Sequence, residues 1–288
     1  MAHSRLATPS ATIEVLKRHG LAAKKSLGQH FLVDDNVVGR ILELAALTGE
    51  ETVLEVGPGL GTLTVALCEK AGAVVAVERD AQLLPVLAAT TAEYPRLAVV
   101  RADAVSVEPE ALSAPFGPPS ALVANLPYAV AATVVLRFFQ ELSELSSATV
   151  MVQSEVADRM AASPGNKQYG SYTVKLRLLA APAGRFTVPR SCFLPPPRVD
   201  SAVLRLERCP LASDPALLTA ASRLADAAFA QRRKTVRNSL RSALGCDTAL
   251  LDEALAQAGI DGSLRAEMLE PERFLALAEV FPEPQARA

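Results

Sequence analysis

Short apolar runs rich in β-branched residues alternate with stretches of helical periodicity along the first half of the chain. Five of these runs predict buried strands, at residues 52–57, 73–78, 97–102, 120–125 and 148–153. Between them, apolar residues recur every three to four positions at 63–71, 80–94 and 130–145, which predicts helices. Strands that are apolar throughout and alternate with helices are typical of a parallel sheet covered on both faces, so we expect an α/β fold.

The pattern changes toward the end of the chain. After the segment 184–189 and a proline-rich stretch, residues 201–208 predict a further strand. No clear helix precedes this strand, so we expect a hairpin-like pairing at one edge of the sheet. Beyond Pro210 the sequence is rich in Ala and Leu and has helical periodicity. We therefore expect an α/β domain at 1–210, followed by a small all-α domain at 211–288.

Composition and charge exclude several classes of protein. The chain has 288 residues with 29 basic and 31 acidic side chains, and its pI of about 6.0 means that nucleic-acid binding has to depend on local basic patches. The four cysteines are scattered and the three histidines do not cluster with them, so we expect reduced thiols and no zinc site. We also expect neither a secretory signal nor a membrane span, because no apolar run is long enough.

A glycine turn follows the first predicted strand. Gly57, Gly59 and Gly61 lie between a strand and a helix in the segment LEVGPGLGTLTVAL at 54–67. A dinucleotide fingerprint would require a further glycine where Thr62 stands, which disfavours a nicotinamide cofactor. Glycine turns at strand-to-helix junctions also occur without a ligand, so the loop by itself leaves its role open.

Two acidic residues follow the next two predicted strands. Glu78 ends the strand at 73–78, and Asp103 follows the strand at 97–102. Each alone could be a solvated strand end, but both would lie at the carboxyl edge of the sheet, where open α/β folds bind ligands. Together with the glycine loop they predict a site for a nucleoside-bearing ligand. S-adenosylmethionine fits, because it offers ribose and adenine to carboxylate partners and carries no phosphate.

A polar step, Asn125-Leu126-Pro127-Tyr128, ends the fourth predicted strand at the same edge. It could be only a strand-terminating turn, because proline cannot donate to a ladder. It also suits methyl transfer to an aromatic amine. The Asn125 oxygen and a backbone carbonyl held by the Leu126-Pro127 step can accept the two N–H groups of the amine, while Tyr128 stacks on the base. The residues alone therefore predict an amino-group methyltransferase.

A longer series of motifs supports this interpretation. In chain order they are KKSLGQHFLVDDNV, LEVGPGLGTLT, VVAVERD, LVANLPY, MVQSEVADRM, YGSYTV, FLPPPRVDSAV, QRRKTVRNSL and LRAEML. Their succession resembles the ribosomal RNA adenine N6-dimethyltransferases of the KsgA type over most of the chain. The resemblance implies a Rossmann-like, seven-stranded methyltransferase domain that uses S-adenosylmethionine and no metal.

The resemblance also implies roles for single residues. Those expected to contact S-adenosylmethionine are His30, Leu32, Gly57, Gly59, Glu78, Asp103 and Asn125. Asn125, Leu126, Pro127 and Tyr128 would hold the target N6, and Phe193 would stack on the adenine from the other side. His30 stands where many members of this family have Asn.

Two basic stretches are candidates for contacting RNA. One of them, at residues 17–31, leads directly into the motifs expected to bind the cofactor. Residues 1–35 would therefore form a segment that clamps RNA and cofactor. The other lies in the helical domain, where Arg233, Arg237 and Arg241 recur every four residues on one predicted helical face. Such a run is commonly a solvated surface, but beside an RNA-modifying site we expect it to bind phosphates. The residues expected to contact RNA are Lys24, Lys25, Arg232, Arg233, Lys234, Arg237 and Arg241.

The function implied by the resemblance is dimethylation of N6 on two adjacent adenosines in the 3′-terminal hairpin loop of small-subunit (16S) ribosomal RNA. The enzyme would act on an immature small subunit, as a cytoplasmic monomer without membrane contact. The alternative within the class is the large-subunit (23S) enzyme of macrolide resistance, against which the segments 193–203 and 231–240 argue. A non-catalytic RNA-binding protein of ribosome assembly is a further alternative, disfavoured by the intact Asn125-to-Tyr128 step.

Overall fold

The computed structural model describes residues 2–24 and 29–281. The chain divides into two compact units, one made of Met1–Ala157 and Pro182–Glu207 and the other of Asp158–Ala181 and Arg208–Ala288. The end of the first unit lies close to the boundary expected near residue 210. The expected division does not foresee, however, that 158–181 belongs with the helical unit.

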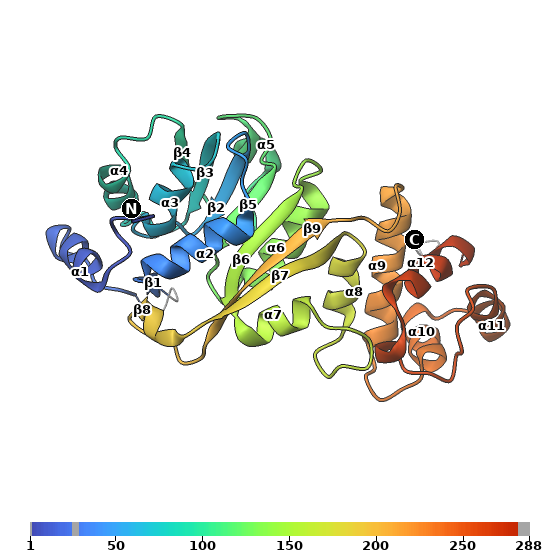
Figure 1. Ribbon diagram of the computed structural model, residues 1–288. Coiled ribbons are helices and arrows are strands. Elements are labelled where there is room, and N and C mark those ends of the chain that lie inside the picture. The colour runs from blue at the N-terminus through green and yellow to red at the C-terminus, as the bar shows by residue number, and fades with distance from the viewer. Residues whose placement is uncertain (1, 25–28, 282–288) are drawn as a thin grey trace. The chain divides into compact units, whose positions relative to one another are not determined.

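A seven-stranded sheet forms the centre of the first unit (Figure 1). Its strands, in spatial order, are β4 (Leu97–Arg101), β3 (Ala73–Glu78), β2 (Thr52–Val56), β5 (Ala121–Asn125), β6 (Ser147–Gln153), β9 (Ser201–Arg208) and β7 (Ala180–Val188). The first five are parallel, and β9 runs antiparallel to β6. The predicted strands and the seven-stranded α/β fold are thus confirmed. The order reverses between β2 and β5, which is where open α/β sheets bind ligands.

Helices cover both faces of this sheet. They are α2 (Asp35–Ala45), α3 (Thr62–Cys68), α4 (Leu84–Thr90), α5 (Pro109–Ser113) and α6 (Ala131–Glu141). Figure 1 shows α2 and α3 on one face and α6 on the opposite one. All of β3 is buried, as its continuous apolar sequence requires. The helix predicted at 80–94 is shorter than expected: it begins only at Leu84, with Pro85 in its first turn, and ends at Thr90.

Two short strands, which no pattern in the sequence indicates, pair segments of the first unit that are far apart in the chain. In β1 (Phe31–Leu32) and β8 (Phe193–Leu194), Phe31 pairs with Leu194 and Leu32 with Phe193. Ahead of β1 lies α1 (Pro9–Arg18), which begins after Thr8, whose hydroxyl accepts the Ala11 N–H at 3.2 Å. Two-residue strands show no periodicity, so only long-range pairing defines them. The pairing places the proline-rich segment after Phe193 beside the segment that begins with His30.

The second unit is helical. Its elements are α8 (Ser171–Arg177), α9 (Pro215–Phe229), α10 (Val236–Leu244), α11 (Thr248–Gln257), the 3₁₀ turn η3 (Ala266–Met268) and α12 (Pro271–Val280), and α7 (Ser154–Met160) leads into it from the first unit. Val174 and Leu178 are buried in the same core as Phe274, and the Tyr169 hydroxyl donates to the Leu269 carbonyl at 2.7 Å. These contacts explain why 158–181 belongs here.

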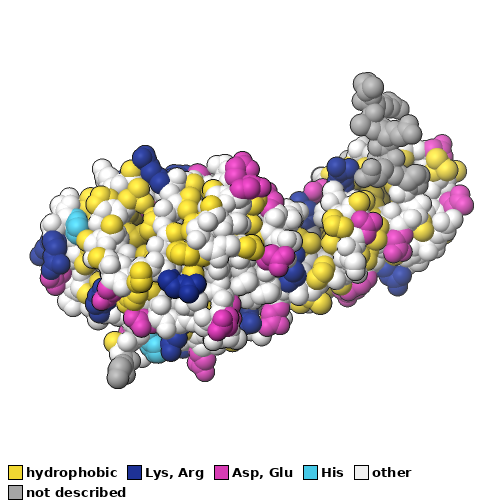
Figure 2. Space-filling view, turned by 90° about the horizontal axis from the view of Figure 1, so that it is seen from above, with side chains coloured by type: hydrophobic (Ala, Val, Ile, Leu, Met, Phe, Trp, Pro, Cys, Tyr) yellow, Lys and Arg dark blue, Asp and Glu magenta, His cyan; other side chains and the backbone are white. Residues whose placement is uncertain are grey.

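The charged residues are mixed on the surface. On the face drawn in Figure 2, Lys and Arg side chains are interspersed with acidic ones, in agreement with a formal net charge of −2. Among the helices of residues 2–24 and 29–281, none combines the length and the apolar character that crossing a bilayer requires. Any binding of a polyanion therefore has to depend on particular groups of side chains rather than on the overall charge.

Candidate active site

A cavity of about 420 Å³ lies at the carboxyl edge of the sheet, where the order of the strands reverses. The glycine loop after β2 forms one wall, and the residues that follow β3, β4 and β5 form the others. Gly59 has a φ of +61°, and a Cβ there would approach the Phe31 ring to 3.3 Å. Glycine is therefore needed at this position both for the backbone conformation and for the close packing against Phe31.

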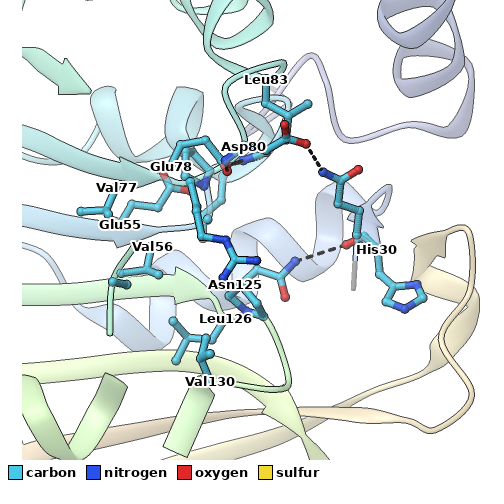
Figure 3. Close-up of a pocket in the computed structure, with 18 of the residues that line it drawn as sticks. His30, Glu55, Val56, Val77, Glu78, Asp80, Leu83, Asn125, Leu126 and Val130 are labelled. Carbon is cyan, nitrogen blue, oxygen red and sulfur yellow. Dashed lines mark hydrogen bonds between the residues drawn. The ribbon is translucent and has the colours of Figure 1, made fainter. Parts of the chain in front are cut away.

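Glu78 lies at the end of β3 with only 6% of its surface exposed (Figure 3). Its carboxylate accepts the N–H of Asp80 at 2.7 Å and the N–H of Gly59 at 3.3 Å. Burial raises the pKa of this carboxyl, while these two backbone hydrogen bonds oppose the rise. The acid is thus tied directly to the glycine loop, and it is fixed in a position from which it can accept hydrogen bonds from a ribose.

Two further aspartates line the same cavity as Glu78. Asp103 accepts the Val105 N–H and the Arg79 guanidinium, both at 3.0 Å, and these contacts lower its pKa. Asp80, which the sequence patterns did not single out, contacts Lys24 at 2.8 Å and the Gln29 amide at 2.9 Å. Burial acts to raise its pKa, but the hydrogen bonds outweigh this effect and the pKa is lowered. Asp80 therefore anchors the segment before β1 to the cavity wall.

Asn125 ends β5 at the cavity. Its side-chain N–H group donates to the His30 carbonyl at 3.5 Å (Figure 3). Within residues 2–24 and 29–281, no hydrogen bond reaches its Oδ1 atom or the Leu126 carbonyl, whereas the Leu126 N–H is engaged with Met151 at 3.0 Å. The Asn125-Leu126 step therefore offers two unused hydrogen-bond acceptors on a backbone held by β6, and a donor of two N–H groups would satisfy both.

Tyr128 lines the same cavity, and a hydrogen bond to its hydroxyl group fixes its ring. Its hydroxyl forms a 2.7 Å hydrogen bond with the hydroxyl of Ser201, which is fully buried at the start of β9. The His30 ring faces it, with centroids 5.9 Å apart and planes 25° from parallel, and His30 Nδ1 lies 2.8 Å from the Pro195 carbonyl. Both rings are thus fixed by hydrogen bonds, and each presents an aromatic surface to the other.

Phe193 lies in a different environment from the one its expected role requires. It is 3% exposed, packs in the core of the first unit and is not among the residues that line the cavity. The ring that faces Tyr128 is that of His30, although stacking of Phe193 on a target base stays a prediction. Leu32, expected to contact the cofactor, is buried and lines the cavity.

Glu55, in the middle of β2, is a lining residue that sequence reasoning missed. It is 1% exposed, and no described residue forms a hydrogen bond with its Oε2 atom. Burial raises its pKa to about 8, and the neighbouring Glu78 carboxylate adds to the rise. Its signal in the sequence was a lone acid within an otherwise apolar strand, since buried carboxyl groups rarely occur without a role or a partner.

The residues expected to bind RNA are in several environments. Lys24 is engaged with Asp80, and Lys25 lies outside the described residues. The expectation that Arg233, Arg237 and Arg241 share one helical face is wrong, because α10 begins only at Val236, after Thr235, whose hydroxyl accepts the Asn238 N–H. Arg233 is exposed in the loop before α10, and Arg237 forms an ion pair with Asp252.

The cavity fits S-adenosylmethionine. Its volume suits a small ligand, the buried carboxylate of Glu78 lies where a ribose needs an acceptor, and the apolar walls include Leu32 and Val77. Gly59 allows the backbone to approach without a side chain. Within residues 2–24 and 29–281, no group of three or more His, Cys, Asp or Glu side chains is arranged to hold a metal.

Fold and cavity define the class of S-adenosylmethionine-dependent methyltransferases with a Rossmann-like sheet. Among solved structures, the 23S ribosomal RNA methyltransferase ErmE is 30% identical, with a TM-score of 0.66 over 87% of this chain and 99% of that one. A dimethyladenosine transferase from Plasmodium falciparum has a TM-score of 0.72 at 23% identity, over 86% of this chain and 96% of that one, and supports the fold.

The profile described as Ribosomal RNA adenine dimethylase matches residues 20–283. Several relatives carry the name Ribosomal RNA small subunit methyltransferase A, among them the following two. The one from Shouchella clausii is 39% identical over 96% of this chain and 95% of its own length, and the one from Magnetococcus marinus is 42% identical over 92% and 94%. The chain belongs to the ribosomal RNA adenine dimethylase family.

Proposed function

We propose that this protein transfers methyl groups from S-adenosylmethionine to N6 of two adjacent adenosines in the 3′-terminal hairpin loop of small-subunit ribosomal RNA, giving N6,N6-dimethyladenosine. Its substrate is the immature small subunit, on which it acts as a monomer in the cytoplasm. The relatives named as small-subunit methyltransferases support this RNA. One observation carries the chemistry, namely the pair of unused acceptors, Asn125 Oδ1 and the Leu126 carbonyl, next to the Tyr128 ring.

An adenine amino group is a weak nucleophile because its lone pair is delocalised into the ring. S-adenosylmethionine supplies the methyl group together with a sulfonium leaving group. Asn125 Oδ1 and the Leu126 carbonyl accept the two N6–H groups, which favours a pyramidal nitrogen with its lone pair directed at the methyl carbon. No general base is needed to start the reaction, since the nitrogen can lose its proton to water after the N–C bond has formed.

The same two acceptors permit a second transfer. After the first methylation N6 keeps one N–H group, so one acceptor still holds it while the methyl group occupies the place of the other hydrogen. Tyr128 fixes the plane of the base in both rounds, because its hydroxyl is held by Ser201 independently of the amine. Dimethylation therefore requires only that the cavity near Asn125 admits one methyl group.

The experiment is methyl transfer from labelled S-adenosylmethionine to immature small subunits and, in a parallel reaction, to large-subunit ribosomal RNA, with primer extension across both RNAs. We expect stops at two adjacent adenosines of small-subunit RNA. The likeness to ErmE supports large-subunit RNA as the second candidate, and a stop in large-subunit RNA alone would establish that candidate instead. RNA binding without label in either RNA would leave only the non-catalytic alternative.

The Asn125→Ala variant tests the proposed chemistry. We expect kcat to fall by about 100-fold or more, as for other donors and acceptors aimed at a reacting group, while S-adenosylmethionine binding is partly retained because Glu78 and Asp103 remain. Asn36→Ala removes an exposed amide of α2 and serves as the matched control. Normal turnover by Asn125→Ala would show that its amide does not hold the amine.

A further inference from the structure

The second unit contains a cavity of its own, of about 340 Å³. Its walls come from α7, the loop at 163–170, the start of α8, the end of α9 with the loop that follows, and η3. All of these residues lie within Asp158–Ala181 and Arg208–Ala288, so the cavity belongs entirely to this unit. Its volume is in the range of small-ligand sites.

The cavity concentrates positive charge. Four basic side chains line it, Arg159, Lys167, Arg232 and Lys234, and none of them forms an ion pair with a described residue. The acidic side chain in the wall is Glu267, which lies 3.8 Å from Arg265. Four unpaired cations around one cavity repel one another, and an anion bound among them would remove this repulsion.

Tyr172, one of the residues in the same wall, carries a buried hydroxyl group. No described residue forms a hydrogen bond with the Tyr172 hydroxyl, although its oxygen is inaccessible to solvent. Burial raises the pKa of Tyr172 and the nearby Arg159 charge opposes the rise, so the hydroxyl keeps its proton and can donate. An unsatisfied buried hydroxyl is unfavourable for folding and is removed or paired in most proteins. Its presence beside four cations points to an acceptor that comes from outside the chain.

The walls of the cavity are held in place before any ligand binds. The Gly165 N–H donates to the Glu267 carbonyl at 2.8 Å, which ties the loop at 163–170 to η3. The Tyr169 hydroxyl donates to the Leu269 carbonyl, and the Tyr169 ring packs against Phe229 with centroids 6.1 Å apart. Phe229 and Ala228 add apolar surface to the cavity. The site is therefore larger than a bare anion needs and has both a charged and an apolar wall.

We propose that this cavity binds one nucleotide of the ribosomal RNA backbone, whose phosphodiester oxygens accept hydrogen bonds from the surrounding basic side chains and, once those side chains move onto the phosphate and uncover it, from the Tyr172 hydroxyl. The ribose and base lie against the apolar wall of Phe229. This proposal deepens the proposed function and rests on it for the identity of the RNA. A phosphodiester suits the site because its two free oxygens are acceptors only, and charge-assisted hydrogen bonds to Arg and Lys are among the strong ones.

The Tyr172→Phe variant is the sharpest test, because it removes only the hydroxyl. We expect KM for immature small subunits to rise roughly tenfold, as for a lost hydrogen bond to a charged group, while kcat and S-adenosylmethionine affinity are unchanged. The variant should resist urea at least as well as the original chain, since an unsatisfied hydroxyl has gone. A purely structural Tyr172 would change unfolding and leave KM where it was, and that result would overturn the proposal.

The cations are tested by salt dependence. In the double variant Arg159→Gln with Lys167→Gln, the slope of log affinity for immature small subunits against log salt should become shallower by roughly 0.7 to 0.9 for each lost phosphate contact. Arg96→Gln, an exposed arginine after α4 in the first unit, is the matched control and should leave the slope unchanged. Equal slopes for the double variant, the control and the original chain would exclude a phosphate in the cavity.

Two outcomes separate the sources of the phosphate and the two proposals. If free adenosine 5′-monophosphate binds the original chain tightly and Tyr172→Phe weakens only that binding, the cavity is a site for free nucleotides, and the RNA assignment is wrong. If the original chain fails to methylate RNA, the proposed function fails, while filter binding of the same variants to small subunits still decides whether the cavity holds RNA.

Discussion

Replacing Glu55 by Gln should make the stability of the first unit less dependent on pH. Burial raises the pKa of Glu55 from 4.5 to about 8, so the folded chain keeps a proton that the unfolded chain loses. A carboxyl group of this kind stabilises most below pH 4.5, and its contribution is lost as the pH rises through the folded-state value. Each pH unit in this interval lowers the free energy of unfolding by about 1.4 kcal/mol.

The loss therefore amounts to about 3 kcal/mol at pH 7 and about 5 kcal/mol above pH 8. No discount for solvent screening applies, because Glu55 is 1% exposed. Gln has nearly the same shape and does not titrate. We expect Glu55→Gln to match the original chain within about 1 kcal/mol near pH 5, and to exceed its stability by several kcal/mol at pH 8.

Urea unfolding of the cofactor-free protein between pH 5 and 9 measures this difference, provided that the transition of the first unit is followed separately from that of the helical unit. Glu50→Gln removes an exposed carboxyl group next to β2 and should keep the pH dependence of the original chain. A constant difference between Glu55→Gln and the original chain from pH 5 to 9 would refute the reasoning, because it would mean that Glu55 is ionised in the folded state.

Three further substitutions test the site and the surface. Ser201→Ala should lower kcat roughly tenfold, because Tyr128 loses the hydrogen bond that fixes its ring, and KM for S-adenosylmethionine should be unchanged. Steady-state kinetics measures both constants, and an unchanged kcat would show that Ser201 does not position Tyr128. Gly61→Ala should destabilise the first unit by more than about 1 kcal/mol in urea unfolding. The φ angle of Gly61 is +92°, and a Cβ at this position would lie 3.0 Å from Thr90 Oγ1. Equal stability of the variant and the original chain would show that the glycine loop adapts to the new side chain. Arg233→Gln should reduce the salt slope of RNA binding more than Arg237→Gln, since Arg237 is already paired with an aspartate, and equal effects would show that this pair opens for RNA.

The sequence by itself determined the α/β fold and the strand that each of the main site residues follows. Apolar runs define β2, β3, β5 and β6, because a strand buried on both faces has to be apolar throughout. The run at 97–102 likewise marks β4, although this edge strand is only partly buried. The glycine loop, Glu78, Asp103 and the Asn125 step each follow such a strand. Parallel strands place their carboxyl ends at one edge, so the strand order was sufficient to bring these residues to one cavity.

The tertiary structure decided what depends on contacts between distant parts of the chain. Pairing of β1 with β8 places His30, rather than Phe193, opposite Tyr128, and nothing local in either segment indicates which ring faces the cavity. The grouping of 158–181 with the helical unit follows from a shared core, and no boundary in composition marks it.

Charged and hydroxyl side chains show the same limit. Lys24 and Arg237 are basic in the sequence in the same way as Arg232, yet the fold gives the first two a carboxylate partner and leaves the third at the cavity of the second unit. Periodicity reports which face of an element is buried, because burial depends on local spacing. Whether a polar group is satisfied depends on which distant atoms reach it, as the unpaired hydroxyl of Tyr172 demonstrates, and this only the packed chain determines.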